Sequence, residues 1–255
     1  MYRPAIHFFA SARPIAQKAK TKLVKRYGQA NEEDADTIVA LGGDGAMLQA
    51  LHRRFDDKRP VYGMHRGTVG FLMNEYEEDD LLERLDNAER AIIYPLRVAA
   101  TDAAGQTHIR LAINEVSLFR QTAQSALLQV FVDGKERMTR LSCDGLMVAT
   151  PAGSTAYNLS ANGPILPIGA NLLALTPVSA YRPRRWRGAL LRHDAKVEIE
   201  AADFDRRPIA VAADNQEVRD IKRAEIIEDR SRGLVMLFDP GHALDERILR
   251  EQFLV

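Results

Sequence analysis

The chain has 255 residues, of which 46% are hydrophobic and 27% charged, a globular balance with enough length for a large core and two domains. Lys plus Arg and Asp plus Glu number 35 each, so the zero net charge lacks the basic excess of a general nucleic-acid or membrane-surface protein. No apolar stretch approaches the roughly 20 residues that cross a bilayer. Because Cys143 is the only cysteine, there is no disulfide framework, and we expect a cytoplasmic protein.

The first third of the chain alternates strand and helix patterns. Residues 37–41 form a continuous apolar and β-branched run, typical of a strand buried on both faces, and the run ends at Gly42-Gly43-Asp44-Gly45. Apolar residues then recur at helical spacing as far as Phe55, which predicts a strand, a glycine turn and a helix. We therefore assign residues 1–90 to a Rossmann-like α/β domain. Its other expected elements are a strand at 6–10, a helix at 16–27, a strand at 61–64 and acidic, helix-favouring sequence at 75–88.

From about Tyr94 the pattern changes to short apolar runs separated by turn signals such as Asp133-Gly134. Residues 196–200 alternate with period two, as in a half-exposed strand. We expect residues 91–240 to form a mainly antiparallel β domain and the helical tail, within 241–255, to pack back on the first domain. The other expected strand regions are 96–100, 109–119, 127–132, 208–227 and 234–238.

The glycine-rich turn at Asp44 is the strongest local signal for chemistry. Glycines let the backbone approach a phosphate closely, and the following helix offers unpaired N–H groups and a positive dipole end. A carboxylate in such a turn can accept a proton from a substrate hydroxyl. The alternative is a tight turn in which Asp44 caps the next helix, and the tetrapeptide alone does not separate the two.

Two further constellations suggest a binding pocket. Residues 144–160 place glycine, small hydroxyl residues and Tyr157 directly after a strand pattern, which suits a polar pocket, although Ser154 and Thr155 could equally be helix caps. Asn114-Glu115 is a polar pair within an apolar run. One of the pair should face inward and need a partner, which a polyhydroxylated ligand could supply. A surface bulge or a structural hydrogen-bond network would explain the pair equally well.

Together these motifs resemble the NAD kinase family. They occur in its order and at similar separations, and recognisable similarity covers most of residues 37–167. Residues 63–72 are similar to the family's loop between the nucleotide-handling strands, and weaker likeness extends through 214–216. The turn at Asp44 alone is shared with diacylglycerol kinases, sphingosine kinases and 6-phosphofructokinases. The 144–160 block with Asn114-Glu115 is far more specific.

The resemblance implies a role for each matched position. Asp44 is the expected general base on the 2′-hydroxyl of the adenosine ribose of NAD, and Gly45 and Phe71 line the same cleft. Asn114 and Glu115 are expected to hold the ribose and phosphate region. The remaining implied NAD contacts are Asp144, at the nicotinamide carboxamide, and Thr155, Ala156, Tyr157 and Ser160, around a base or ribose.

The resemblance also implies ATP as co-substrate, with Mg²⁺, and a homodimer or homotetramer in which a neighbouring subunit completes each site. No phosphate-binding lysine motif is present, so backbone N–H groups and the metal ion must stabilise the transferring phosphoryl group. The six histidines show no metal-ligand spacing, and we assign no residue as a metal ligand. Cys143 is expected to be a buried small residue without a base beside it.

The chain departs from the family pattern at three positions and in one segment. Ala46 and Ala152 stand where hydroxyl residues are usual, and Asn215 replaces a common glycine. Residues 182–187 are rich in arginine and could contact a triphosphate, a neighbouring subunit or only solvent. These departures bear on donor preference, ATP or polyphosphate, and leave the chemistry of Asp44 intact.

Two rival functions share some of these features. A lipid kinase of the same superfamily would keep Asp44 but should present an apolar cleft in place of polar Asn114, Asp144 and Ser160. A non-catalytic NAD-sensing module would bind the dinucleotide and turn nothing over. An assay with NAD, ATP and Mg²⁺ separates the three.

Overall fold

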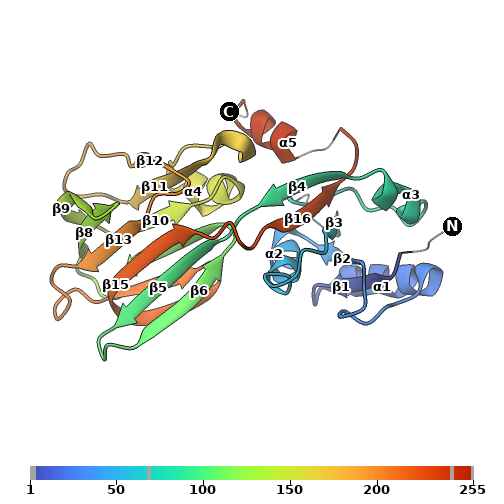
Figure 1. Ribbon diagram of the computed structural model, residues 1–255, viewed down its shortest axis with the longest axis horizontal. Coiled ribbons are helices and arrows are strands. Elements are labelled where there is room, and N and C mark those ends of the chain that lie inside the picture. The colour runs from blue at the N-terminus through green and yellow to red at the C-terminus, as the bar shows by residue number, and fades with distance from the viewer. Residues whose placement is uncertain (1–3, 68–69, 242–243, 254–255) are drawn as a thin grey trace. The chain divides into compact units, whose positions relative to one another are not determined.

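The computed structural model describes residues 4–67, 70–241 and 244–253, and the chain divides into two compact units (Figure 1). The first comprises Met1–Ile93 with Ser231–Val255, and the second comprises Tyr94–Arg230. The predicted combination of an α/β domain and a mainly antiparallel β domain is confirmed. The boundaries differ from those expected after residues 90 and 240. Residues 68–69 of the glycine-rich loop and residues 242–243 and 254–255 of the tail lie outside the described part of the chain.

In the described residues, the first unit is built on a five-stranded sheet. β2 (Thr37–Gly42) is buried along its whole length, as its apolar run predicts. It lies between β1 (Ile6–Ala10) and β3 (Val61–His65), both parallel to it. The run at 234–238, expected in the β domain, instead pairs parallel with β3 and antiparallel with β4 (Glu89–Ile93). An apolar run shows that a strand is buried but not in which sheet, so its assignment to the second domain was wrong. In sheet order the strands are β1 (Ile6–Ala10), β2 (Thr37–Gly42), β3 (Val61–His65), β16 (Leu234–Phe238) and β4 (Glu89–Ile93).

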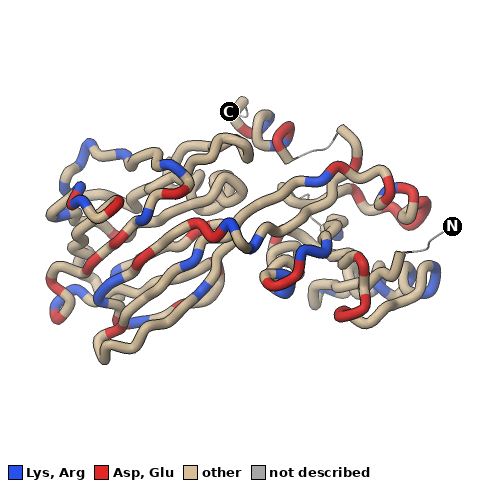
Figure 2. Tube along the Cα trace, viewed as in Figure 1, with Lys and Arg blue, Asp and Glu red and all other residues tan. Residues whose placement is uncertain are grey.

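The helices of the first unit follow their sequence signals with one exception. α1 (Pro14–Tyr27) starts with proline at its first turn and ends at Gly28, which has a φ of 88°. α2 (Asp44–His52) follows β2 directly, and α5 (Leu244–Glu251) is the C-terminal helix. The acidic sequence at 75–88 yields only α3 (Leu81–Asp86), with a cluster of acidic residues at and before it in Figure 2. The residues before α3 form ion pairs with α1 instead, Glu78 with Lys22 and Asp79 with Arg26.

The second unit is a large antiparallel sheet, with eleven strands in the described residues. The expected strand at 109–119 is in fact two strands, because the chain leaves the ladder at 113–114. The region 208–227 is a hairpin with its turn at Asp214. The strands are β5 (Leu96–Asp102), β6 (Thr107–Ala112), β7 (Glu115–Arg120), β8 (Ala126–Val132), β9 (Lys135–Cys143), β10 (Gly145–Ala149), β11 (Leu172–Val178), β12 (Ala189–Arg192), β13 (Val197–Ala201), β14 (Ile209–Ala213) and β15 (Gln216–Glu228). Three short helical turns complete the unit: η1 (Ala152–Thr155), α4 (Tyr157–Ser160) and η2 (Ile168–Ala170).

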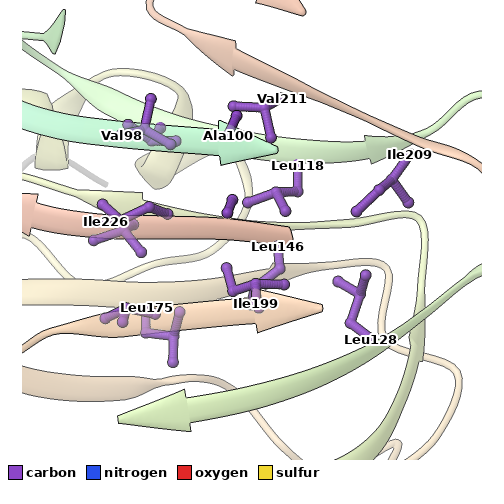
Figure 3. Close-up of a cluster of buried hydrophobic side chains, with 14 of the residues drawn as sticks. Val98, Ala100, Leu118, Leu128, Leu146, Leu175, Ile199, Ile209, Val211 and Ile226 are labelled. Atoms are coloured by element: carbon purple, nitrogen blue, oxygen red, sulfur yellow. The ribbon is translucent and has the colours of Figure 1, made fainter. Parts of the chain in front are cut away.

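One apolar core holds this sheet together. Burial alternates along β5 and β8, so every second side chain of these strands faces the core. Figure 3 shows Leu118, Leu146 and Ile199, from three strands, pointing into the same cluster. Because this core fixes the strands, it also fixes the loops at their ends, and these loops carry the polar residues of the candidate site. None of the helices in the described residues combines the length and the apolar character that a membrane-spanning helix needs.

Candidate active site

The Asp44 carboxylate is bound by backbone N–H groups from a distant segment. Asp44 is the first residue of α2, and Gly43 before it is the cap residue, with extended backbone. One carboxylate oxygen accepts from the N–H of Phe71 at 2.9 Å and the other from the N–H of Leu72 at 2.8 Å. The side chain therefore does not cap its own helix, and the capping alternative is wrong.

An open cleft of about 430 Å³ borders this carboxylate. A Cβ atom added to Gly43 or Gly45 would meet nothing within 4 Å, so both backbones are open to a close-approaching ligand. A Cβ atom on Gly70 would lie 2.4 Å from an Asp44 carboxylate oxygen, so a glycine is needed there. The residues lining the cleft are Ser11, Arg13, Gly43, Asp44, Gly45, Ala46, Gln49 and Gly70.

Three of these lining residues, Ser11, Arg13 and Gln49, were not predicted from sequence. Arg13 is an exposed cation that precedes Pro14 at the start of α1. Ser11 has a buried hydroxyl with no hydrogen-bond partner among the described residues. The arginine supplies a positive charge and the serine an unsatisfied polar group beside the N-terminus of α2, an arrangement that favours a bound anion.

In the second unit, Asp214 clamps the polar pair Asn114-Glu115. Its carboxylate accepts from the N–H groups of Ile113 at 2.7 Å, Asn114 at 2.9 Å and Glu115 at 3.4 Å. These N–H groups are satisfied without a neighbouring strand, which is why the expected single strand is broken here. The clamp fixes the backbone of the pair and leaves its side chains to other partners.

Both side chains of the pair keep an unsatisfied buried oxygen. Asn114 Oδ1 and Glu115 Oε2 have no hydrogen-bond partner within the described residues. Burial, and secondarily the Asp214 carboxylate, raise the pKa of Glu115 to about 7. Buried polar atoms without partners are rare in folded proteins, so the pair is a candidate for binding a ligand with hydroxyl groups.

The segment after β10 packs tightly against this pair. Thr150 donates from Oγ1 to the carbonyl of Ile113 at 2.8 Å and accepts from the Gly153 N–H at 3.0 Å. A Cβ atom on Gly153 would lie 2.1 Å from the Asn114 carbonyl oxygen, so only glycine fits. Ser154 is fully buried and bonded to the backbone of Pro151 and Leu166, so it is structural.

The predicted NAD-binding residues of this segment lie on η1 and α4, except Ala156, which joins the two. Thr155 and Ala156 are half-buried, whereas Tyr157 and Ser160 are exposed. The Tyr157 ring lies 5.8 Å from that of Phe119, which supports it from one side. Tyr157 is thus an exposed aromatic against which a base could stack.

Asp144 lies at the opposite end of β10 from Asn114 and Glu115. Its Oδ1 accepts from Arg120 Nε at 2.6 Å and from the Tyr181 hydroxyl at 3.1 Å, two partners that the sequence did not predict. At the other end of β10, the Thr150 N–H donates to the carbonyl oxygen of Asn114. Asp144 and Thr150 are six positions apart along the strand. At about 3.3 Å per residue this is roughly 20 Å.

The structure thus gathers some of the predicted residues and separates others. In the first unit, the Phe71 N–H donates a hydrogen bond to the Asp44 carboxylate, and Gly45 is the next residue after Asp44. Asn114 and Glu115 lie with the segment after β10, and Asp144 lies apart from them. Cys143 is buried as expected, and burial, with Asp144 second, raises the pKa of its thiol to about 12, so the thiol is protonated at neutral pH. The arginines at 182, 184, 185 and 187 are exposed.

Comparison with known proteins matches both halves of the chain to domains of one family. The ATP-NAD kinase N-terminal domain matches residues 5–90 and the ATP-NAD kinase C-terminal domain matches residues 113–231. The chain is 66% identical over 248 residues to a protein named NAD kinase from Hyphomonas neptunium, covering 97% of each chain. It is 57% identical over 258 residues to one from Caulobacter vibrioides, covering 99% of each.

Two solved structures share the fold. A yeast NADH kinase complexed with NADH matches with a TM-score of 0.84 at 20% identity, over 98% of this chain and 88% of that one. An NAD kinase from Archaeoglobus fulgidus in complex with ATP matches with a TM-score of 0.75 at 24% identity, over 98% and 97%. The shared fold extends over nearly the whole of this chain.

We expect Gly153→Ala to destabilise the protein by about 1–3 kcal/mol, because the added methyl group must displace the backbone of Asn114. Gly169→Ala is the matched control, since a Cβ atom there meets nothing within 4 Å. Denaturant unfolding of both variants measures the difference. Equal stability of the two would show that the contact between residues 153 and 114 is looser than described.

Glu115 should make stability depend on pH. Its pKa is raised from 4.5 to about 7, so the folded state holds a proton that the unfolded state has released between these values, and stability falls as pH rises through this window. The loss amounts to about 3 kcal/mol above pH 7. Glu115→Gln should therefore melt higher than the parent at pH 8 and at about the same temperature at pH 4.5, whereas Glu217→Gln, at an exposed position, should follow the parent. If the melting temperatures of the parent and of Glu115→Gln changed with pH in the same way across this range, the raised pKa of Glu115 would be contradicted.

Proposed function

The chain belongs to the ATP-NAD kinase family, and on this premise we propose that it transfers the γ-phosphoryl group of ATP to the 2′-hydroxyl of the adenosine ribose of NAD, with Asp44 as general base. The observation that carries this assignment is the Asp44 carboxylate bordering an open cleft beside Gly43, Gly45 and Arg13. The family match sets aside the lipid kinase alternative. Turnover of NAD with ATP separates a kinase from a non-catalytic NAD-sensing module.

Asp44 has the acceptor capacity that the reaction needs. A carboxylate offers about four lone-pair positions, and the N–H groups of Phe71 and Leu72 take two of them. A remaining position accepts the proton of the 2′-hydroxyl as its oxygen attacks the γ-phosphorus and the bond to the ADP oxygen breaks. Products are NADP and ADP, and the proton stays on Asp44 until solvent removes it.

The same cleft offers groups for the triphosphate. Arg13 supplies a positive charge, and the open backbones of Gly43 and Gly45 at the start of α2 supply N–H groups at the positive end of a helix dipole. In the described residues no group of three metal-ligating side chains is present. Asp44 is the carboxylate in this cleft that could help to hold Mg²⁺ together with the substrate phosphates and water, and the ion would neutralise phosphate charge.

We propose that the second unit supplies the other NAD contacts. The unsatisfied oxygens of Asn114 and Glu115 can accept from ribose hydroxyls, and Tyr157 offers a ring for stacking, with Thr155, Ala156 and Ser160 around it. Asp144 uses Oδ1 for Arg120 and Tyr181, so its Oδ2 is the oxygen offered to the nicotinamide carboxamide.

The position of Asp144 supports a homodimer or homotetramer. It lies roughly 20 Å along β10 from Asn114-Glu115, so we propose that Asp144 of one copy completes the site of another. β12 is an edge strand of the sheet and carries Leu190, which is 54% exposed. Exposed apolar edge strands commonly pair with another chain.

Asp44→Asn should lower kcat by at least about 10²-fold, the usual effect of losing a general base. Asparagine has one acceptor where the structure needs two, so we also expect a stability loss of about 1–3 kcal/mol. Asp36→Asn is the matched control, because this carboxylate also accepts a backbone N–H, from Ala5 at 2.7 Å, but lies outside the cleft. Steady-state kinetics with melting curves decide: turnover near the parent value per folded Asp44→Asn molecule would rule out Asp44 as the base.

Asp144→Ala should weaken NAD binding by about 1.5–3 kcal/mol, the contribution of a hydrogen bond to a charged group, and should raise the KM for NAD far more than that for ATP. Equal effects on both substrates would favour a structural role in the Arg120 ion pair. Mixing Asp44→Asn with Asp144→Ala protein tests which copy Asp144 serves. If it serves a neighbour, mixed oligomers contain one complete site and regain activity, whereas no gain on mixing places it in its own copy's site.

A further inference from the structure

The C-terminal helix α5 contacts the segment that binds the Asp44 carboxylate. Arg247 donates from Nη1 to the carbonyl oxygen of Phe71 at 3.0 Å and also to that of Met73. The N–H groups of Phe71 and Leu72, in the same segment, donate to Asp44. A chain of hydrogen bonds therefore runs from α5 through residues 71–73 to Asp44.

Arg247 is held firmly in this position. Leu244 and Ile248, one turn apart on the same helix, are each 1% exposed and anchor α5 in the first unit. The Arg247 guanidinium lies 5.1 Å from the centre of the Phe238 ring of β16. Burial lowers the pKa of Arg247, and the carboxylates of Asp239 and then Asp44 oppose this shift. A half-buried cation of this kind costs free energy unless it makes specific hydrogen bonds.

The far end of the same segment is anchored independently. Asn74 is fully buried and donates from Nδ2 to the carbonyls of Gly63 and Leu237, each at 3.0 Å. This contact ties residue 74 to β3 and β16 without involving Asp44. Residues 71–73 directly precede Asn74 in the chain. Arg247 donates hydrogen bonds to the carbonyl oxygens of two of these three residues.

We propose that Arg247 is a positioning residue for the phosphoryl transfer: by holding the carbonyls of Phe71 and Met73, it fixes the N–H groups that orient the Asp44 carboxylate. The inference rests on the proposed role of Asp44 as general base. It makes the C-terminal helix α5 a support for the segment that binds the Asp44 carboxylate. Small displacements of a catalytic group are costly, about 10²-fold for 1 Å, so a support of this kind affects turnover more than binding.

Arg247→Met tests the proposal, because methionine keeps an apolar stem beside Phe238 and removes the donors. We expect kcat to fall by about 10- to 100-fold, with the KM values for NAD and ATP changed by no more than about twofold. Arg247→Lys should recover part of the loss, since its ammonium group still donates to carbonyl oxygens. Arg250→Met is the control: Arg250 is exposed on the same helix and pairs with Glu246, so its kcat should match the parent.

A double-mutant cycle separates positioning from helix docking. In the Asp44→Asn background, Arg247→Met should cause little further loss, because both changes act on the same step. Parent-like kcat in Arg247→Met, or the same fold-loss with and without Asp44, overturns the proposal. Arg247→Gln replaces Arg247→Met under the same criteria if the latter does not fold. If Asp44→Asn itself keeps turnover, the base assignment fails and the proposal fails with it, whereas loss in Asp44→Asn alone rejects only the role of Arg247.

Discussion

Two backbone hydrogen bonds, from the N–H groups of Phe71 and Leu72 to the Asp44 carboxylate, determine the arrangement of the candidate site in the first unit. They require the chain to return from β3 to the start of α2, and they require a side chain no larger than hydrogen at Gly70. The glycine turn before α2 keeps the rest of the carboxylate's surroundings open. The proposed base is therefore already oriented and needs little rearrangement to accept a proton, and such positioning is a main contribution of the protein in phosphoryl transfer.

The second unit uses the same physical device with the roles reversed. There the carboxylate of Asp214 is the support, and the three successive N–H groups that it accepts belong to the segment that carries Asn114 and Glu115. In the first unit the backbone holds the side chain of the proposed base, whereas in the second a side chain holds the backbone of the proposed NAD-binding pair. In the second unit Asn114 Oδ1 and Glu115 Oε2 are buried and have no hydrogen-bond partner among the described residues, and burial raises the pKa of Glu115.

The sequence predicted the local units well and the partners between them poorly. The buried run before Asp44, the glycine turn and the helix after it are local patterns, and they appear where expected. The supporting residues are distant in sequence: Arg247 bonds to a residue 176 positions away, and Asp214 to one 100 positions away. Periodicity carries no information about such pairs, and an isolated arginine or aspartate reads as a surface residue. The assignment of the run at 234–238 to the wrong sheet has the same origin, because strand pairing is a tertiary property.

The most direct test of the account is a crystal structure of the protein with NAD and a non-hydrolysable ATP analogue. The account predicts that an Asp44 carboxylate oxygen lies about 2.6–3.2 Å from the adenosine 2′-oxygen, the reach of a general base. It also predicts that the N–H groups of Phe71 and Leu72 still donate to that carboxylate. A 2′-hydroxyl bonded to another acceptor, with Asp44 turned away from the ribose, would contradict it.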